Sequence, residues 1–510
     1  MKKKEVNFSS GETRSYWVKH AESKYPALNN NIDVDVLIIG GGIAGLSCAY
    51  ELLKNGKSVA LIEDGIIGSG ESSRTSAHLS SCLDSRYFEL INKFGLSNAK
   101  LAAQSHAEAI DLIEKITLEE AIKCNFKRVD GYLFIDSKET KLDELEKEAK
   151  ALEEMGNLSF EWAERAPFKT LDTGPCLRFL NQGQFDPVKY LEGLARAIIE
   201  RGGFIFESTH ALDIKDGEPC CVTTSDGRLI KALDIIVATG SLVNDRVLIQ
   251  TKLAQYRTYA IIVSLPHGDI HEGLFWDTLD PYHYVRLVPS AEQDTDYVLI
   301  GGKDHKTGQN QEPEQVFAAL EKWAKQNFLA HKVIYRWSGQ IVEPVDGLAY
   351  TGRNPGDKHV FVHTGHSGNG LTYAAIASTL LTKLILDKKS PYEELYDPRR
   401  KSIKSAGEYV EENSNTAAQY ADWFKASECD IKAISRTEGA IIRQGLTPKA
   451  VYKDEMGEVY CLSAVCPHLG GIVRWNNLEK SWDCPCHGSR FDAQGGVLNG
   501  PANRGLKKIK

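Results

Sequence analysis

The chain has no basic segment, no low-complexity tract and no internal repeat. Its 510 residues carry a net charge of −8, so the composition does not favour binding to nucleic acid or to an anionic membrane. The 11 cysteines are scattered and odd in number, which disfavours a disulfide framework. The charged start at residues 1–8 is not followed by the apolar core of a secretory signal. We therefore expect a cytoplasmic protein without nucleic-acid partners.

No stretch of the sequence is typical of a membrane span. The most apolar segment, residues 36–53, is interrupted by Glu51 and by glycines at motif spacing, so we expect no transmembrane segment. A chain of 510 residues is too long for a single hydrophobic core. We therefore expect two or three domains.

Four potential metal ligands lie near the C-terminus in two short boxes, Cys466-Pro-His468 and Cys484-Pro-Cys-His487. Each box holds one ligand cysteine and one histidine. This pattern matches a Rieske [2Fe–2S] centre, in which two thiolates bind one iron and two imidazoles bind the other. Zinc also accepts two cysteines and two histidines, but its usual spacings separate the cysteines from the histidines. The boxes therefore favour a one-electron carrier over zinc.

A glycine-rich turn follows an apolar run in the first fifty residues. Gly40, Gly42 and Gly45 fit the pattern G-x-G-x-x-G between a predicted strand and a predicted helix. A second predicted strand, residues 57–62, leads to Glu63, where a carboxylate can bind the ribose of an adenosine. The combination predicts an α/β dinucleotide-binding domain.

Three further landmarks resemble, in order, the glycine oxidase and sarcosine oxidase branch of FAD-dependent oxidoreductases, the D-amino-acid oxidase type. They are the loop at residues 70–78, the end of a predicted strand at residues 232–240, and a predicted helix start at residues 365–372. The resemblance spans roughly residues 30–390. It implies noncovalent FAD, because the family's attaching cysteine is missing between residues 339 and 370. The residues implied to bind FAD at these landmarks are Ser73, Arg74, Thr75, Ala77, Ala238, Thr239, Gly240, Gly368, Asn369, Gly370, Leu371 and Thr372.

The segments around the two boxes resemble the Rieske family. In its respiratory members, the cysteine inside the second box forms a disulfide with a cysteine three residues after the histidine of the first box. Here Cys486 is present, but the partner position holds Gly471, so we expect no such disulfide. The family's serine donor to the cluster is present as Ser489, whereas its tyrosine donor is replaced by Phe491. We therefore expect a reduction potential in the lower part of the span of about −150 to +300 mV for Rieske centres.

The arginine or lysine that binds a substrate carboxylate in this flavoprotein branch is missing. The stretch 338–343 contains no arginine, and Thr372 stands at the position of the lysine. An unpaired carboxylate in a closed pocket would cost several kcal/mol, on the order of 2–7 kcal/mol, so a small amine is favoured over a free α-amino acid. Our pocket candidates are Tyr282, Tyr284, Arg286 and Thr372. The first three alternate and would share one face of a strand, either as a pocket wall or in ordinary sheet packing.

These patterns predict the fold class and the domain order. We expect an α/β FAD-binding domain of the Rossmann-like, glutathione-reductase type with an α+β substrate domain, followed by an all-β Rieske domain. The predicted regions are a polar lead at 1–30, the oxidoreductase at 31–395, a helical connector at 396–427 and the Rieske domain at 428–510. FAD-binding segments are expected near 31–90, 205–245 and 340–390.

The predicted function is an FAD-dependent dehydrogenase that oxidises a C–N bond of a small amine and passes electrons singly through the cluster to an unidentified acceptor. A second G-x-G-x-x-G is missing, which argues against an NAD(P)H-dependent reductase. Two alternatives stay open: an amine oxidase that uses O2, with a structural or redox-sensing Rieske domain, and an electron-transfer or redox-sensing protein without a small substrate. Rieske-dependent oxygenation would need a mononuclear iron site, for which no compact candidate is evident. No catalytic base is predicted.

Overall fold

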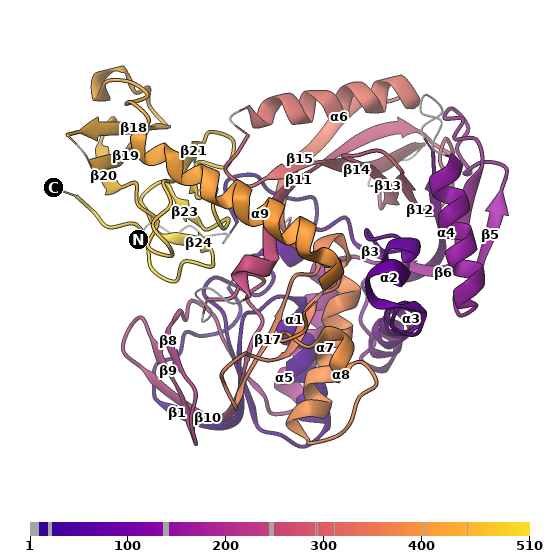
Figure 1. Cartoon of the computed structure of the whole chain (residues 1–510), viewed down its shortest axis with the longest axis horizontal. Helices are drawn as coiled ribbons and strands as arrows, with labels where there is room; N and C mark the ends of the chain where they lie inside the picture. Colours follow the sequence, from indigo (N-terminus) through magenta and orange to yellow (C-terminus); the bar gives the residue numbers. More distant parts are fainter. Residues whose placement is uncertain are drawn as a thin grey trace.

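A computed structural model gives the structure of residues 10–18, 23–135, 142–243, 249–290, 292, 294–310, 312–401, 403–445 and 447–509. Two large β-sheets form the body of the molecule, and two small sheets form a C-terminal domain at one side (Figure 1). A long helix, α9 (Ala406–Gln419), runs from the body toward the C-terminal domain. The predicted fold class is confirmed.

The first sheet has eight strands in the order β16-β17-β10-β1-β2-β7, with β8 and β9 attached through β10. Strands β7, β2, β1, β10 and β17 run parallel. They are apolar because helices cover the sheet, as is usual for parallel strands. The bounds are β1 (Ile32–Ile39), β2 (Val59–Ile62), β7 (Phe204–Phe206), β8 (Ala211–Lys215), β9 (Cys220–Thr224), β10 (Leu229–Val237), β16 (Tyr350–Arg353), β17 (Val360–Thr364), and the helices α1 (Ile43–Lys54), α5 (Pro187–Glu200) and α7 (Gly370–Ile385).

The second sheet has nine strands in the order β15-β11-β14-β13-β12-β4-β6-β3, with β5 paired to β6. It is largely antiparallel, and α6 covers part of one face with a buried apolar stripe (Figure 1). The bounds are β3 (His78–Leu79), β4 (Lys127–Phe134), β5 (Phe160–Ala163), β6 (Cys176–Gln184), β11 (Leu253–Pro266), β12 (Leu274–Asp277), β13 (His283–Val288), β14 (Thr295–Lys306), β15 (Lys332–Pro344), α2 (Tyr87–Phe94), α3 (Leu96–Glu119), α4 (Leu142–Met155) and α6 (Pro313–Asn327).

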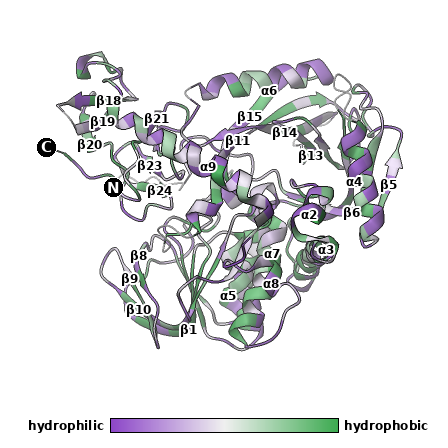
Figure 2. Ribbon diagram, viewed as in Figure 1, coloured by the Kyte–Doolittle hydropathy of each residue, from purple (hydrophilic) through white to green (hydrophobic). Residues whose placement is uncertain are grey.

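The C-terminal domain follows α8 (Glu393–Tyr396), α9 and a 3₁₀ turn at Tyr420–Phe424. Figure 2 shows α9 as mostly hydrophilic, and none of its described residues is buried, as expected for a helix that bridges two domains along the surface. The domain contains two antiparallel sheets. Their strands are β18 (Glu438–Gln444), β19 (Thr447–Lys453), β20 (Val459–Ser463), β21 (Arg474–Asn476), β22 (Ser481–Asp483), β23 (Arg490–Asp492) and β24 (Val497–Asn499).

The N-terminal lead takes part in the packing between domains. Thr13 donates its backbone N–H to Glu479 of the C-terminal domain at 3.0 Å, and Ser15 and Trp17 bond to carbonyl groups of Ser73 and Thr75. Residues 1–9 and 19–22 of the predicted polar lead lie outside the described residues. The described part of the lead therefore joins the first sheet's loops to the C-terminal domain.

Glu479 is the buried ionic contact between the domains, with a side chain that is 0 % exposed. Its Oε1 atom lies 3.1 Å from Arg257 and 3.7 Å from Arg74, both also buried, and it accepts a hydrogen bond from Ser338. Burial opposes ionisation of Glu479, but Arg74, Arg257 and Arg490 outweigh it and hold its pKa below the ordinary value. The Glu479 carboxylate therefore balances the positive charges of two buried arginines that lie outside the C-terminal domain.

We expect Glu479→Ala to destabilise the protein by about 3–5 kcal/mol, because it leaves buried arginines without their counter-ion. Urea unfolding followed by tryptophan fluorescence measures the loss. The matched control is Glu314→Ala, which breaks an exposed ion pair with Arg336 and is expected to change stability by no more than about 1 kcal/mol. Equal effects of the two substitutions would contradict the role given to Glu479.

Candidate functional site

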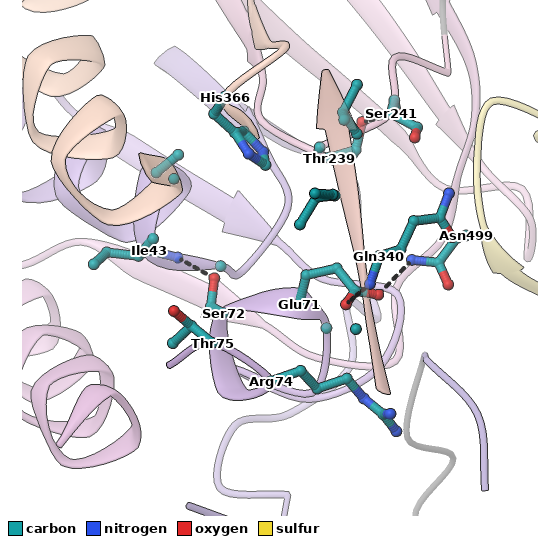
Figure 3. A pocket seen from close by; sticks show the side chains of 18 of the residues that line it. Ile43, Glu71, Ser72, Arg74, Thr75, Thr239, Ser241, Gln340, His366 and Asn499 are labelled. Carbon is teal, nitrogen blue, oxygen red and sulfur yellow. Dashed lines mark hydrogen bonds between the residues drawn. The ribbon is translucent and has the colours of Figure 1, made fainter. Parts of the chain in front are cut away.

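A large pocket lies where the carboxyl ends of the parallel strands of the first sheet face the second sheet, the usual ligand position in such folds. The turn after β1, the loop at residues 70–76, the turn after β10 and the start of α7 contribute to its lining. The second sheet and the C-terminal domain supply the rest. Figure 3 shows Thr239, His366 and Ser72 around this space.

The glycine turn fits a closely packed cradle. Gly40 has a φ of 114°, and a Cβ there would lie 2.5 Å from the carbonyl oxygen of Ala238. Gly40 and Gly42 line the pocket, whereas Gly45 does not; a Cβ on Gly45 would clash with the Gly40 carbonyl. The first two glycines therefore leave room for a ligand, and the third lets α1 pack against the turn.

Glu63 follows β2 and lines the same cradle. Its carboxylate accepts hydrogen bonds from the backbone N–H groups of Gly41 at 2.6 Å and Gly65 at 2.8 Å. Burial raises the pKa of Glu63 to about 7 in spite of these two bonds. A ribose hydroxyl could donate a further hydrogen bond to this carboxylate, in place of the water that a less buried carboxylate would bind.

Most of the other residues that the sequence predicts for FAD lie around the pocket. Those in the lining are Arg74, Thr75, Ala238, Thr239, Gly240, Gly368, Asn369, Gly370 and Leu371. The Arg74 guanidinium, however, donates to the carbonyl groups of Gly11, Thr13 and Ser338, so only the rest of this residue is available to the pocket (Figure 3). Ser73 and Ala77 lie outside the lining, and the hydroxyl of Ser72 is in it, accepting the Ile43 N–H at 3.0 Å.

The structure places two of the four substrate-pocket candidates in the pocket lining and the other two elsewhere. Tyr282 and Tyr284 line the pocket. Arg286 does not: it donates to the Ala77 carbonyl at 2.7 Å, and its guanidinium lies over the Trp17 ring. Thr372 is also elsewhere, since its hydroxyl bonds to His106 Nδ1 at 2.8 Å inside the protein. We correct the predicted positions of Arg286 and Thr372 accordingly.

Several lining residues were missed by sequence reasoning. The second sheet contributes His78, Asp304 and Gln340, and the C-terminal domain contributes Asn499 and neighbouring residues. Figure 3 shows Glu71 between Gln340 and Asn499, accepting the Gln340 N–H at 2.7 Å and the Asn499 amide at 3.2 Å. Asn499 ends β24 and Asp304 lies near the end of β14, so a search for polar residues at strand ends could have found these two.

The two cysteine–histidine boxes come together in the C-terminal domain. The thiols of Cys466 and Cys484 are buried and hydrogen-bonded to each other, and the rings of His468 and His487 lie 5.0 Å apart at 89°. Within the described ranges no three His, Cys, Asp or Glu side chains converge on one point that could hold a single ion. The two neighbouring thiols and the two neighbouring imidazoles fit a cluster in which each iron takes two ligands.

Groups next to the boxes agree with the expectations from the sequence. Ser489 hydrogen-bonds to the thiol of Cys466 and accepts the Ala502 N–H at 3.0 Å. Cys486 is a free thiol, and a Cβ on Gly471 would lie 2.5 Å from its sulfur. A cysteine at position 471 would therefore reach Cys486, but Gly471 has no thiol with which to form the disulfide of the respiratory Rieske proteins.

One hydrogen bond links the pocket wall to the second box. Gln340 Nε2 donates to the carbonyl oxygen of Gly488 at 3.0 Å, and Gly488 directly follows His487. The segment from Val497 to Gly500 of the same domain lines the pocket. The C-terminal domain thus closes one side of the pocket and holds its second box against the wall.

Comparison with known proteins identifies both parts. The profile of the family described as FAD dependent oxidoreductase matches residues 35–384, and that of the Rieske [2Fe-2S] domain matches residues 426–510. The chain belongs to the FAD-dependent oxidoreductase family. This oxidoreductase binds FAD, and its Rieske domain binds a [2Fe–2S] cluster, as the sequence predicted.

Similar proteins include one with the whole architecture. The Bacillus subtilis (strain 168) protein YhfW, whose name describes a Rieske 2Fe-2S iron-sulfur protein, is 32% identical over 99% of both chains. Gamma-glutamylputrescine oxidoreductase of Escherichia coli (strain K12) is 25% identical over 73% of this chain and 89% of that protein. The glycine oxidase structure from Geobacillus kaustophilus shares the fold, with a TM-score of 0.59 and 20% identity over 72% of this chain and 99% of that one.

The pocket of this FAD-dependent oxidoreductase is also suited to a polar ligand, because several buried polar atoms of its lining lack a hydrogen-bond partner within the described structure. Five buried lining atoms have no hydrogen-bond partner within the described structure, namely His78 Nε2, Asp304 Oδ1, Gln340 Oε1, His363 Nε2 and His366 Nδ1. Buried polar atoms are normally hydrogen-bonded, so these atoms are suited to a bound flavin and substrate. Of the helices that the structure describes, none has the length and apolarity to cross a membrane.

We expect Gly45→Ala to weaken FAD binding, because the added methyl group forces α1 away from the glycine turn at an overpacking cost of about 1–3 kcal/mol. Flavin absorbance of the purified protein and FAD titration of the stripped protein measure the change. Gly407→Ala is the control, since a Cβ at this helical position meets nothing within 4 Å. Full flavin content in Gly45→Ala would contradict the packing role of this glycine.

The proposed cluster ligands can be tested separately from FAD. We expect Cys466→Ser to lose the reduced-cluster signal in electron paramagnetic resonance and most of the bound iron while it keeps FAD. Cys461→Ser changes a half-buried cysteine of the same domain that lies in β20, outside both boxes, and is expected to keep cluster and iron. An unchanged cluster signal in Cys466→Ser would remove this residue from the ligand set.

Proposed function

We propose that this protein is a dehydrogenase that oxidises a C–N bond of a small amine and passes the electrons singly through its own Rieske domain to an external acceptor. FAD supplies two-electron acceptor chemistry and the cluster supplies one-electron transfer. We further propose that the lining residues of the glycine cradle and of the α7 start hold FAD. The proposed cluster ligands are Cys466, His468, Cys484 and His487.

The contact between Gln340 and Gly488 carries the proposal. It joins a residue of the FAD pocket to the residue that follows a proposed cluster ligand, His487. Asn499 adds a second link, through Glu71. Because both contacts lie within one chain, they support electron transfer from the pocket to the cluster without a partner subunit.

The choice of a C–N bond rests on relatives and on the pocket wall. The name of the Escherichia coli relative describes an oxidoreductase of gamma-glutamylputrescine, which is an amine derivative. The stretch that resembles the arginine-bearing turn of glycine oxidase relatives, residues 338–343, contains no arginine, and its Gln340 donates to the Rieske domain. These features support an amine and disfavour a free α-amino acid.

The proposal predicts two linked signals when the oxidised protein is mixed anaerobically with an amine panel. Flavin absorbance should fall, and the reduced-Rieske signal should rise after it. In Gln340→Leu we expect slower cluster reduction, because the contact between pocket wall and second box is lost. Gln309→Leu is the matched control, since Gln309 bonds to Pro485 of the same box but is not part of the pocket lining.

The wild-type result decides between the candidate functions. Flavin bleaching with a cluster that stays oxidised would overturn the dehydrogenase proposal and favour an oxidase that uses O2. Equal slowing in Gln340→Leu and Gln309→Leu would show that docking of the box, rather than the pocket contact, controls the transfer.

A further inference from the structure

The second sheet presents a wall of aromatic rings to the pocket. Trp276, Tyr282 and Tyr284 line it, together with His78. The His78 ring lies 5.3 Å from Trp276 and 6.0 Å from Tyr284, and the two tyrosine rings lie 6.0 Å apart. Faces of such rings attract cations.

Two carboxylates stand in the same wall. Asp304, near the end of β14, lines the pocket and bonds to the Thr258 hydroxyl, but its buried Oδ1 atom has no hydrogen-bond partner among the described residues. Asp84 also lines the pocket and accepts the Gly368 N–H at 2.6 Å. A Cβ on Gly368 would lie 2.7 Å from Asp84 Oδ2 and 3.2 Å from the Tyr282 hydroxyl, so the acid and the phenol converge.

The acids lack a cation of their own in the lining. Arg74 is the one lysine or arginine among the described lining residues, and its guanidinium is bound to carbonyl groups outside the pocket. Burial, with a smaller contribution from the nearby Asp84 and Asp280, raises the pKa of Asp304 to about 7. Burial likewise raises the pKa of Glu343 to about 8, with Asp304 and Asp84 adding to the effect. A bound positive charge would relieve this repulsion.

His78 gives an independent sign of a ligand. Its side chain is more than nine-tenths buried in the pocket wall, and its Nε2 atom has no hydrogen-bond partner in the part of the chain that the structure describes. Burial, together with the nearby Arg286, holds the pKa of His78 well below its ordinary value, so the ring is neutral. It therefore does not compensate the carboxylates, and it offers a free nitrogen to whatever binds beside them.

We propose that this wall is the subsite for the ammonium group of the substrate, with Asp304 as its anchoring carboxylate, Asp84 as the second acid and the three aromatic rings as its sides. The inference rests on the proposed function and deepens it, because it commits the substrate to a cationic amine without a carboxylate next to the ammonium. A flavin brings no positive charge, so it does not satisfy these acids.

The test is calorimetric titration of the oxidised holoenzyme with tetramethylammonium, which has a charge but no proton to lose and no lone pair. We expect it to bind the wild type, and Asp304→Asn to weaken binding at least about tenfold, as for a lost charged partner. Asp84→Asn should weaken it less. Asp296→Asn is the matched control in the same strand, because Asp296 bonds to Gly268 outside the pocket.

The affinity for tetramethylammonium should also rise as pH increases through about 7. The probe does not titrate, and the carboxylate of Asp304 must be ionised to bind it, so binding is strong above its pKa and lost below it. The titratable groups that face Asp304 are Asp84, Asp280, Glu343, Tyr282 and Tyr284. A flat pH profile, or unchanged binding in Asp304→Asn with normal FAD content, overturns the subsite.

Substrate oxidation separates this inference from the proposed function. Anaerobic flavin reduction by n-butylamine and putrescine, compared with glycine, gives a KM for each. If amines reduce wild type and Asp304→Asn with the same KM, the subsite is wrong and the dehydrogenase stands. If tetramethylammonium binds at Asp304 but no amine reduces the flavin, the dehydrogenase proposal fails and the subsite stands. A lower KM for glycine than for n-butylamine would overturn the subsite.

Discussion

The arrangement of the two redox domains depends on a single buried carboxylate. Glu479 comes from the Rieske domain, and the arginines that surround it, Arg74 and Arg257, come from the flavoprotein. Removing two or three charges from water is expensive unless their geometry is complementary, so the pair tolerates little movement between domains. The same contact includes Thr13 and Ser338, which tie the N-terminal lead and β15 to one point.

This constraint explains why two residues that the sequence comparison assigns to the flavin or substrate pocket contact the Rieske interface instead. Arg74 lies in the loop along the flavin pocket, yet its guanidinium serves the domain interface. Gln340 lies in β15, in the stretch that resembles the arginine-bearing turn of glycine oxidases, yet it bonds to the second cluster box. The Rieske domain therefore docks against one wall of the pocket.

The sequence predicts best what is encoded in consecutive residues. The glycine turn and the two cysteine–histidine boxes need fixed residues at fixed spacing, because a tight turn and a cluster impose local geometry. The pocket wall is different, since Asp304 and Gln340 belong to separate strands whose register sets their proximity. Arg286 shows the limit: alternation gives its face of the strand, but the packing of Trp17 against that face decides what it contacts. Thr372 turns into the protein toward His106 for a similar reason.

The charge of the proposed substrate wall follows from the same use of pocket residues at the domain interface. The stretch 338–343 of β15 contains no arginine, the guanidinium of Arg74 is bound to carbonyl groups outside the pocket, and Asp84 and Asp304 are among the acids of the described lining. A carboxylate-bearing substrate would meet two acids in a low-dielectric space, whereas an ammonium would meet two counter-ions and aromatic faces.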